Sequence, residues 1–176
     1  MSNRYHLMRI GSATGGAFFM EILKELVNNK ILITAIVGYF TAQVVKSVIE
    51  AIMDRTFSLS RLFSGNGGMP SSHSSTVCAL ATMTVFEHGV NSFEFAISIV
   101  FAIVVMVDAS GVRRETGKQA VILNELMEYF ASIKDNPPSF SHDKLKELIG
   151  HSPLQVQVGA ALGIVIALIM QFIVYR

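Results

Sequence analysis

Residues 93–110, FEFAISIVFAIVVMVDAS, decide the fold class, because positions 95–107 carry no charged side chain. A bilayer-spanning helix needs about 20 predominantly apolar residues, and this stretch is close to that length. Asn91 and Ser92 precede it as helix-capping residues, and Glu94 lies in the first turn, where a carboxylate is favourable. The stretch therefore predicts a transmembrane helix.

Further apolar stretches lie on both sides of this one. Residues 31–53 (ILITAIVGYFTAQVVKSVIEAIM) and 155–175 (QVQVGAALGIVIALIMQFIVY) are long enough to span a bilayer, and residues 73–88 predict a more polar helix of marginal length. Small residues at Gly159 and Gly163 allow close helix packing. We expect an all-α integral membrane bundle with about four transmembrane helices and short helices in the loops.

Residues 16–30 (GAFFMEILKELVNNK) show the periodicity of an amphipathic helix that lies at the membrane surface or packs on the bundle. We expect residues 1–30 to form an interfacial segment and residues 31–176 to form one membrane domain. The second polar loop, 111–154, predicts a helix to about Phe130, a break at 136–138 and a short helix from about His142 to Ile149.

Composition limits the possible functions. The 176 residues suffice for one domain, and only 15% are charged, against about 25% in soluble domains. The net charge of +1 gives no electrostatic case for a nucleic-acid partner. The single cysteine, Cys78, excludes an intramolecular disulfide. The His, Asp and Glu residues form no compact set in the sequence, so we predict no metal site and no other cofactor site.

Four spans would bring the loops 54–72 and 111–154 to one side of the membrane and both termini to the other. The polar loops would then share a face, with Lys46 near it at the end of its span. Lys and Arg are more frequent on this face, which favours a cytoplasmic orientation in a bacterial inner membrane or a similar membrane.

The segment Gly67-Gly-Met-Pro-Ser-Ser-His-Ser74 is the first candidate site. Glycines let a backbone approach an anion, and the first turn of the helix after Pro70 offers unpaired N–H groups. Ser71 or Ser72 can cap this helix, and His73 would lie within reach of a bound phosphate. The alternative is an ordinary loop that ends in a Pro/Ser helix cap.

Other polar residues near this face have similar alternatives. Arg113 and Arg114 follow Asp108 and suit phosphate oxygens, but they could also anchor the chain to headgroups. Lys46 is costly within a span, by at least about 2.5–3.5 kcal/mol, which indicates a function unless it only pairs with Glu50. His151 gains interest because the topology brings it to the face that carries His73.

These motifs together resemble a known family. The Gly67–Ser74 segment, Asp108-x-x-Gly-Val-Arg-Arg114, Gly117-x-Gln-Ala120 and Leu148-x-Gly-His-x-Pro153 are similar to motifs of the type 2 phosphatidic acid phosphatase and vanadium haloperoxidase superfamily. They are closest to its divergent small branch, the acid phosphatase/vanadium-dependent haloperoxidase-related membrane proteins. The resemblance covers roughly residues 31–175.

The resemblance implies a metal-independent phosphatase that acts on a lipid phosphate through a phosphohistidine. His151 would be the nucleophile and His73 the general acid. The phosphate oxygens would be held by the remaining polar groups: Lys46, Arg61 (or Arg55), Arg113 or Arg114, and the backbone from Ser71 and Ser72 to His73. The substrate would be phosphatidylglycerophosphate, phosphatidic acid or a prenyl diphosphate.

Two features depart from the family pattern. The spacing from Arg114 to His151 exceeds that of the wider superfamily, although it fits the divergent branch. Gln155 stands where a carboxylate usually supports the nucleophile, so it can accept a hydrogen bond but supplies no charge, unless Asp108 or Glu115 does so. The alternative function is therefore a catalytically impaired or non-catalytic protein that binds anionic headgroups. A transporter is disfavoured because no inverted repeat is present. A homodimer is plausible for so few spans.

Overall fold

The computed structural model describes residues 15–54, 68–133, 145 and 150–176, and every regular element in these ranges is a helix. They are α2 (Gly15–Asn28), α3 (Lys30–Asp54), α4 (Ser72–His88), α5 (Phe93–Ser110), α6 (Val112–Ile133) and α7 (Pro153–Ile169), which ends in the π-helical turn η2 (Met170–Val174). The predicted all-α class is confirmed.

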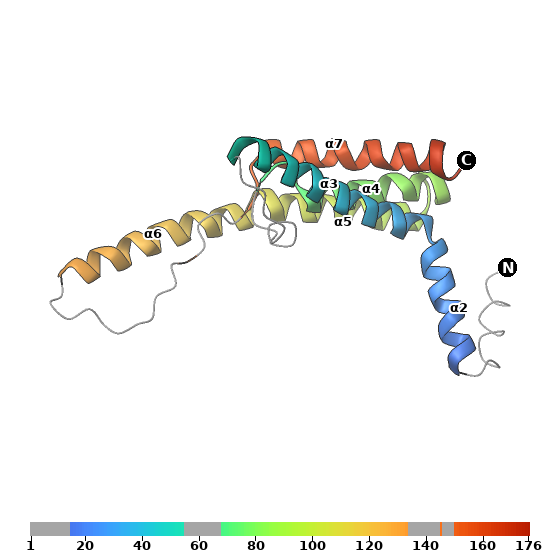
Figure 1. Ribbon diagram of the computed structural model, residues 1–176, viewed down its shortest axis with the longest axis horizontal. Helices are drawn as coiled ribbons and strands as arrows, with labels where there is room; N and C mark the ends of the chain where they lie inside the picture. Colours follow the sequence, from blue (N-terminus) through green and yellow to red (C-terminus); the bar gives the residue numbers. More distant parts are fainter. Residues whose placement is uncertain (1–14, 55–67, 134–144, 146–149) are drawn as a thin grey trace.

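Helices α3, α4, α5 and α7 run side by side, and α4 packs against the other three (Figure 1). At the end of this bundle that carries the C-terminus, α2 turns away from it, whereas α6 continues outward from α5 at the opposite end. The prediction for 16–30 is confirmed as a helix by α2, and the prediction to about Phe130 by α6.

Three of the described helices are long and apolar enough to cross a membrane: Lys30–Met53, Phe93–Phe130 and Pro153–Val174. The integral membrane class is therefore confirmed. The remaining predicted span is α4, whose 17 residues extend about 26 Å, slightly less than a hydrocarbon core of about 30 Å. A span count of four stays a prediction.

Small residues let the helices approach α4 closely. A Cβ atom at Gly159 of α7 would collide with the backbone of Ser71, and one at Gly163 with the carbonyl of Ser75. On the α3 side, the Ser75 hydroxyl donates to the carbonyl of Gly38 at 2.9 Å. The close packing expected from the glycines of the last span is confirmed, and it fixes α4 against α7.

Side-chain caps fix where α4 and α7 begin. Of the two serines that could cap α4, Ser71 does so, because its hydroxyl accepts from the N–H of Ser74. At α7, Ser152 and Gln155 form a capping box, with Pro153 in the first turn. Both helices start at the same end of the bundle, so their first turns lie close together.

The long loop after α6 is described only in part. The predicted break at 136–138 lies outside the described residues, as does the predicted helix from His142 to Ile149 except at Leu145, which is not helical. Asn124 of α6 holds this residue by two bonds: its Nδ2 donates to the Leu145 carbonyl at 2.9 Å, and its Oδ1 accepts from the Leu145 N–H at 3.0 Å.

Candidate active site

Two histidines meet at the end of the bundle where α4 and α7 begin. His73 lies in the first turn of α4, and His151 lies just before α7. Their ring centroids are 6.0 Å apart, with the ring planes at 59°. The two residues are separated by two helices and a long loop in the sequence, yet both rings are within reach of one phosphoryl group.

The backbone at the end of α5 positions His151. Its N–H donates to the carbonyl of Ala109 at 2.9 Å. The preceding residue, Gly150, has φ of +99°, and a Cβ atom there would collide with the backbone of Arg113 and Arg114. Only glycine combines this conformation with this approach. Neither Gly150 nor the Ala109 carbonyl was predicted as a positioning group, although a glycine directly before a motif histidine was a usable signal.

Gln155 orients the His151 ring. Its side-chain oxygen accepts from the Ser152 N–H at 2.9 Å and lies 3.3 Å from Nδ1 of His151. Because an amide oxygen can only accept, Nδ1 carries the proton in this contact and Nε2 keeps its lone pair. The carbonyl of Gln155 also accepts from the Ser71 N–H at 3.1 Å, which links the starts of α7 and α4.

Burial is the main influence on the acidity of His151. It lowers the pKa of the ring, and the hydrogen bond to Gln155 opposes this effect. The charges of His73 and Lys46 lower this pKa further, whereas the backbone of Gly68 raises it. The net direction is downward, so His151 is neutral at neutral pH and can act as a nucleophile.

Lys46 is buried close to both histidines. Its side chain is only 6% exposed, and its charge acts on His73 and on His151. A Cβ atom at Gly68, where φ is +83°, would collide with the Lys46 side chain and with Glu50. This glycine therefore covers Lys46, rather than only exposing backbone to an anion. No ion pair joins Lys46 to Glu50 or to any other described residue.

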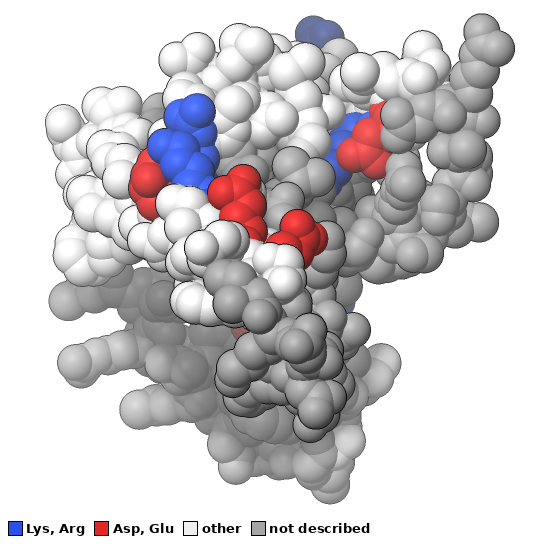
Figure 2. Space-filling model, turned by 90° about the vertical axis from the view of Figure 1, so that its left-hand side faces the viewer, with Lys and Arg blue, Asp and Glu red and all other residues white. Residues whose placement is uncertain are grey.

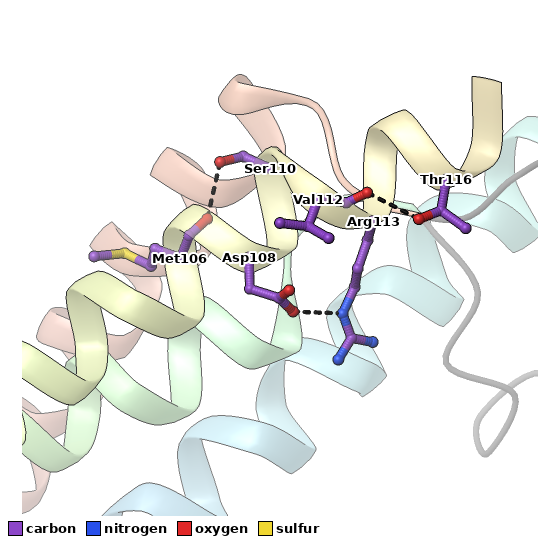
Figure 3. A network of polar contacts seen from close by, with 6 residues as sticks. All are labelled: Met106, Asp108, Ser110, Val112, Arg113 and Thr116. Carbon is purple, nitrogen blue, oxygen red and sulfur yellow. Dashed lines mark hydrogen bonds and ion pairs between the residues drawn. The ribbon is translucent and has the colours of Figure 1, made fainter. Parts of the chain in front are cut away.

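Arg113 and Asp108 form an ion pair at 2.7 Å where α5 meets α6, and Figure 3 shows their side chains pointing toward each other. The charges of both residues act on the ring of His73. Arg114 supports Gly150 through its backbone and makes no ion pair within the described part of the chain. Of the two arginines that the sequence left open, Arg113 is the one whose charge reaches a histidine.

The first turn of α4 offers donors to an anion. Ser71 uses its N–H for Gln155 and its hydroxyl for Ser74, and the N–H groups of Ser72 and His73 have no partner among the described residues. Nδ1 of His73 is buried and has no hydrogen-bond partner among the described residues. A helix N-terminus with free N–H groups favours phosphate binding.

Arg55 and Arg61 are both outside the described residues, so the choice between them stays a prediction. Figure 2 faces this end of the molecule, and the blue and red side chains of the described part lie close to each other rather than in one large patch of a single charge.

Within residues 15–54, 68–133, 145 and 150–176, no three His, Cys, Asp or Glu side chains group in a way that could hold a metal.

Comparison with known proteins identifies the family of the chain. Residues 27–166 match the family described as "Divergent PAP2 family". The chain is 40% identical over 155 residues to the "Uncharacterized membrane protein YuiD" of Bacillus subtilis (strain 168), a match that covers 84% of this chain and 98% of that protein. No solved structure matches the chain.

Proposed function

The chain belongs to the divergent PAP2 family, and from this we propose that it is a membrane phosphohydrolase that cleaves a lipid phosphate through a phosphohistidine intermediate. The observation that carries the proposal is the pair of imidazole rings, His73 and His151, 6.0 Å apart at one end of a membrane helix bundle. The charges of Lys46 and Arg113 act on His73. Headgroup binding needs these cations, but it does not need two facing histidines.

In the first step, Nε2 of His151 attacks phosphorus and forms a P–N bond. The bond from phosphorus to the lipid oxygen breaks, and protonated His73 gives its proton to that oxygen, which leaves as an alcohol or as a shorter phosphate. Lys46, Arg113 and the N–H groups at the start of α4 neutralise charge on the three remaining phosphate oxygens. Phosphoryl transfer depends mostly on such positioning and charge neutralisation.

In the second step, His73 is neutral and removes a proton from water as its oxygen attacks phosphorus. The P–N bond breaks, inorganic phosphate leaves, and His151 recovers its Nε2 lone pair. Gln155 accepts from Nδ1–H throughout, so the same ring nitrogen faces phosphorus in both steps. The substrates we propose are phosphatidylglycerophosphate, phosphatidic acid and prenyl diphosphates.

The amide of Gln155 favours a second candidate function. A carboxylate at this position would stabilise the imidazolium, and in serine proteases the comparable Asp→Asn change lowers turnover by about 10⁴-fold. The chain would then bind anionic lipid headgroups with little or no turnover. Lys46, Arg113 and the start of α4 would suffice for this function.

Phosphate release from the three lipid phosphates, in detergent and with a chelator, tests the proposal. We expect release by the wild type, a radiolabelled and acid-labile phosphoryl group on His151, and loss of both in His151→Ala. The matched control is His6→Ala, a histidine far from His151 in the sequence. Activity that survives loss of His151, or that requires added metal, would contradict the mechanism. Lipid phosphate binding without release would support the headgroup-binding function.

We propose that residues 1–30 anchor the chain at the opposite surface and that residues 31–176 form the catalytic unit. The Lys and Arg residues around the site support a cytoplasmic site. A cysteine introduced at Arg114, in a Cys78→Ala background, should react with a membrane-impermeant thiol reagent only when cells are opened. Labelling of intact cells would reverse the orientation.

A further inference from the structure

Helix α4 is covered on three sides and open on the fourth. Ser75 and Ala79 face α3, the Ser71 and Ser75 carbonyls face α7, and Val77 packs in an apolar cluster with Ala102 of α5. A stripe of His73, Thr76 and Leu80 stays partly exposed. This stripe faces the gap between α3 and α5, which make little contact with each other.

The gap is apolar although its floor contains hydroxyl groups. Thr76 donates its hydroxyl to the Ser72 carbonyl at 2.7 Å, and Thr84 donates to the Leu80 carbonyl at 2.8 Å. On α5, Ser98 donates to the Phe95 carbonyl at 2.9 Å. Because these hydrogen bonds are satisfied within each helix, a polar solute gains little in the gap.

The half of the gap away from the site opens into a groove of about 420 Å³. Leu80 and Thr84 of α4 form its floor, Ile31 of α3 forms one wall, and Ile97 and Phe101 of α5 form the other. Its end away from the site is lined by His88, Phe93 and Glu94. At its far end, Lys30 of α3 forms an ion pair with Glu87 of α4 at 3.0 Å. The groove therefore lies between the histidine end of the bundle and a charged end.

The distance of the groove from His73 can be compared with the thickness of the bilayer's hydrocarbon core. Leu80 and His88 lie about 10 Å and about 22 Å from His73 along the helix axis, at 1.5 Å per residue. The bilayer midplane lies about 15 Å from either edge of a 30 Å hydrocarbon core. A molecule with its phosphate at His73 therefore reaches this groove when its hydrocarbon chain extends about 10 Å, and fills the groove only when the chain passes the midplane.

We propose that this groove binds the hydrocarbon chain of the lipid phosphate whose head lies at His73. The inference rests on the proposed function and adds a chain-length preference to it. The distribution of charge supports a lipid phosphate as the occupant. The stripe begins at a histidine beside the cations Lys46 and Arg113, which suit a phosphate, and continues over apolar surface, which suits a hydrocarbon chain. Because lipid tails are as apolar as the groove, the preference depends on van der Waals contact, and a chain long enough to fill the groove should bind more tightly than one that ends before it.

Photocrosslinking locates the chain without requiring turnover. The probe is hexadecyl phosphate with a diazirine at the far end of its chain, in phosphatidylcholine vesicles that contain full-length His151→Ala protein. We expect labels on Leu80, Thr84, Ile97 or Phe101, and competition by unlabelled hexadecyl phosphate but not by hexyl phosphate. Labels spread evenly over the lipid-facing side of α5, such as Ile99 and Ile103, would overturn the proposal.

Narrowing the groove tests its effect on the reaction. In Leu80→Trp and Ile97→Trp, the ratio of kcat/KM for hexadecyl phosphate to kcat/KM for hexyl phosphate should fall about fivefold or more, because the long chain then overpacks the groove. Ile97 is on the exposed rim, so its replacement does not disturb the interior. Ile103→Trp, which is on the other side of α5, is the matched control and should leave the ratio unchanged.

The results of these experiments distinguish chain binding in the groove from phosphatase activity. Labels in the groove of a protein that releases no phosphate would support the groove and contradict the phosphatase. Phosphate release with an unchanged ratio in both Trp variants would contradict the groove alone. Rapid disulfide formation between two copies of Ile97→Cys, in a Cys78→Ala background, would show that a second chain covers the groove and would also overturn the inference.

Discussion

Helices α4 and α5 lie side by side and have 17 and 18 residues, but α4 is mostly buried whereas α5 is mostly exposed. α4 contains serines, threonines and alanines, and most of its residues are buried. α5 is far more apolar, yet it buries only Ser98, Ala102 and Ala109 and exposes large side chains such as Ile103. Lipid tails are as apolar as these side chains, so apolar character alone does not drive a helix into the interior of the bundle.

Because of this difference, the two helices have different roles. α5 identifies the chain as a membrane protein, whereas α4 determines how the bundle packs and where the site lies. α4 can occupy the centre because its small residues allow close approach and because its hydroxyls bond within the bundle. Its first turn then carries His73 to the same place as His151.

The largest expected effect is at the contact between α4 and α7. A leucine at Gly163 would collide with the carbonyl of Ser75, and we expect Gly163→Leu to lower the free energy of unfolding by more than about 4 kcal/mol, which would prevent recovery of folded protein. Yield and thermal unfolding in detergent would measure it. The control is Gly16→Leu in α2, where nothing lies within 4 Å of the added Cβ. A stable Gly163→Leu protein would contradict a tightly packed α4.

The next effect concerns activity rather than folding. His73→Asn should lower the turnover of a lipid phosphate by about 10²–10⁴-fold, the usual contribution of a general acid, with little change in the melting temperature. Glu87→Gln, at the exposed C-terminal end of the same helix, should change neither value, because its ion pair with Lys30 is exposed. Equal loss of activity in both variants would show that the two ends of α4 do not differ in function.

A smaller effect compares the interiors of the two helices directly. Met83 of α4 is fully buried, so Met83→Ala should cost about 2–5 kcal/mol in unfolding free energy. Ile103 of α5 is 52% exposed, so Ile103→Ala should stay within about 0.5 kcal/mol. Denaturant or thermal unfolding of both variants in one detergent gives the comparison. Similar losses would mean that α5 is covered, for example by a second copy of the chain.

Much of this arrangement was predictable from the sequence. Helix positions followed from apolar runs and capping residues, and the meeting of His73 with His151 followed from the alternation of spans. The role of Gln155 as a hydrogen-bond acceptor was predictable because its side chain can accept but supplies no charge. These inferences needed only spacing and residue chemistry.

Other features depend on three-dimensional fit that spacing does not contain. The contact of Gly150 with the Arg113–Arg114 backbone and the cover that Gly68 gives Lys46 require two distant segments to meet. The open side of α4 is also invisible in the sequence, because Thr76 and Leu80 are ordinary residues in a helix. The helix predicted around His142 to Ile149 was not helical at Leu145, whose backbone instead pairs with Asn124.

The smallest expected effect is a shift in the pH dependence of kcat/KM. It concerns the site where α5 ends and α4 begins. Burial lowers the pKa of His151, so the acid limb of kcat/KM should lie below about 6.5, and activity should fall as the pH drops through that limb because the imidazolium has no free lone pair. Gln155→Glu retains the capping-box geometry with Ser152 and places a carboxylate at Nδ1. That charge favours the imidazolium, so the limb should move upward by about 1 unit or more. Rate profiles from pH 4 to 9 would measure the acid limb of the wild type and of Gln155→Glu, and Glu87→Gln should leave it unchanged. An acid limb that does not move in Gln155→Glu would mean that it reports a group other than His151, and the nucleophile would have to be sought elsewhere at this end of the bundle.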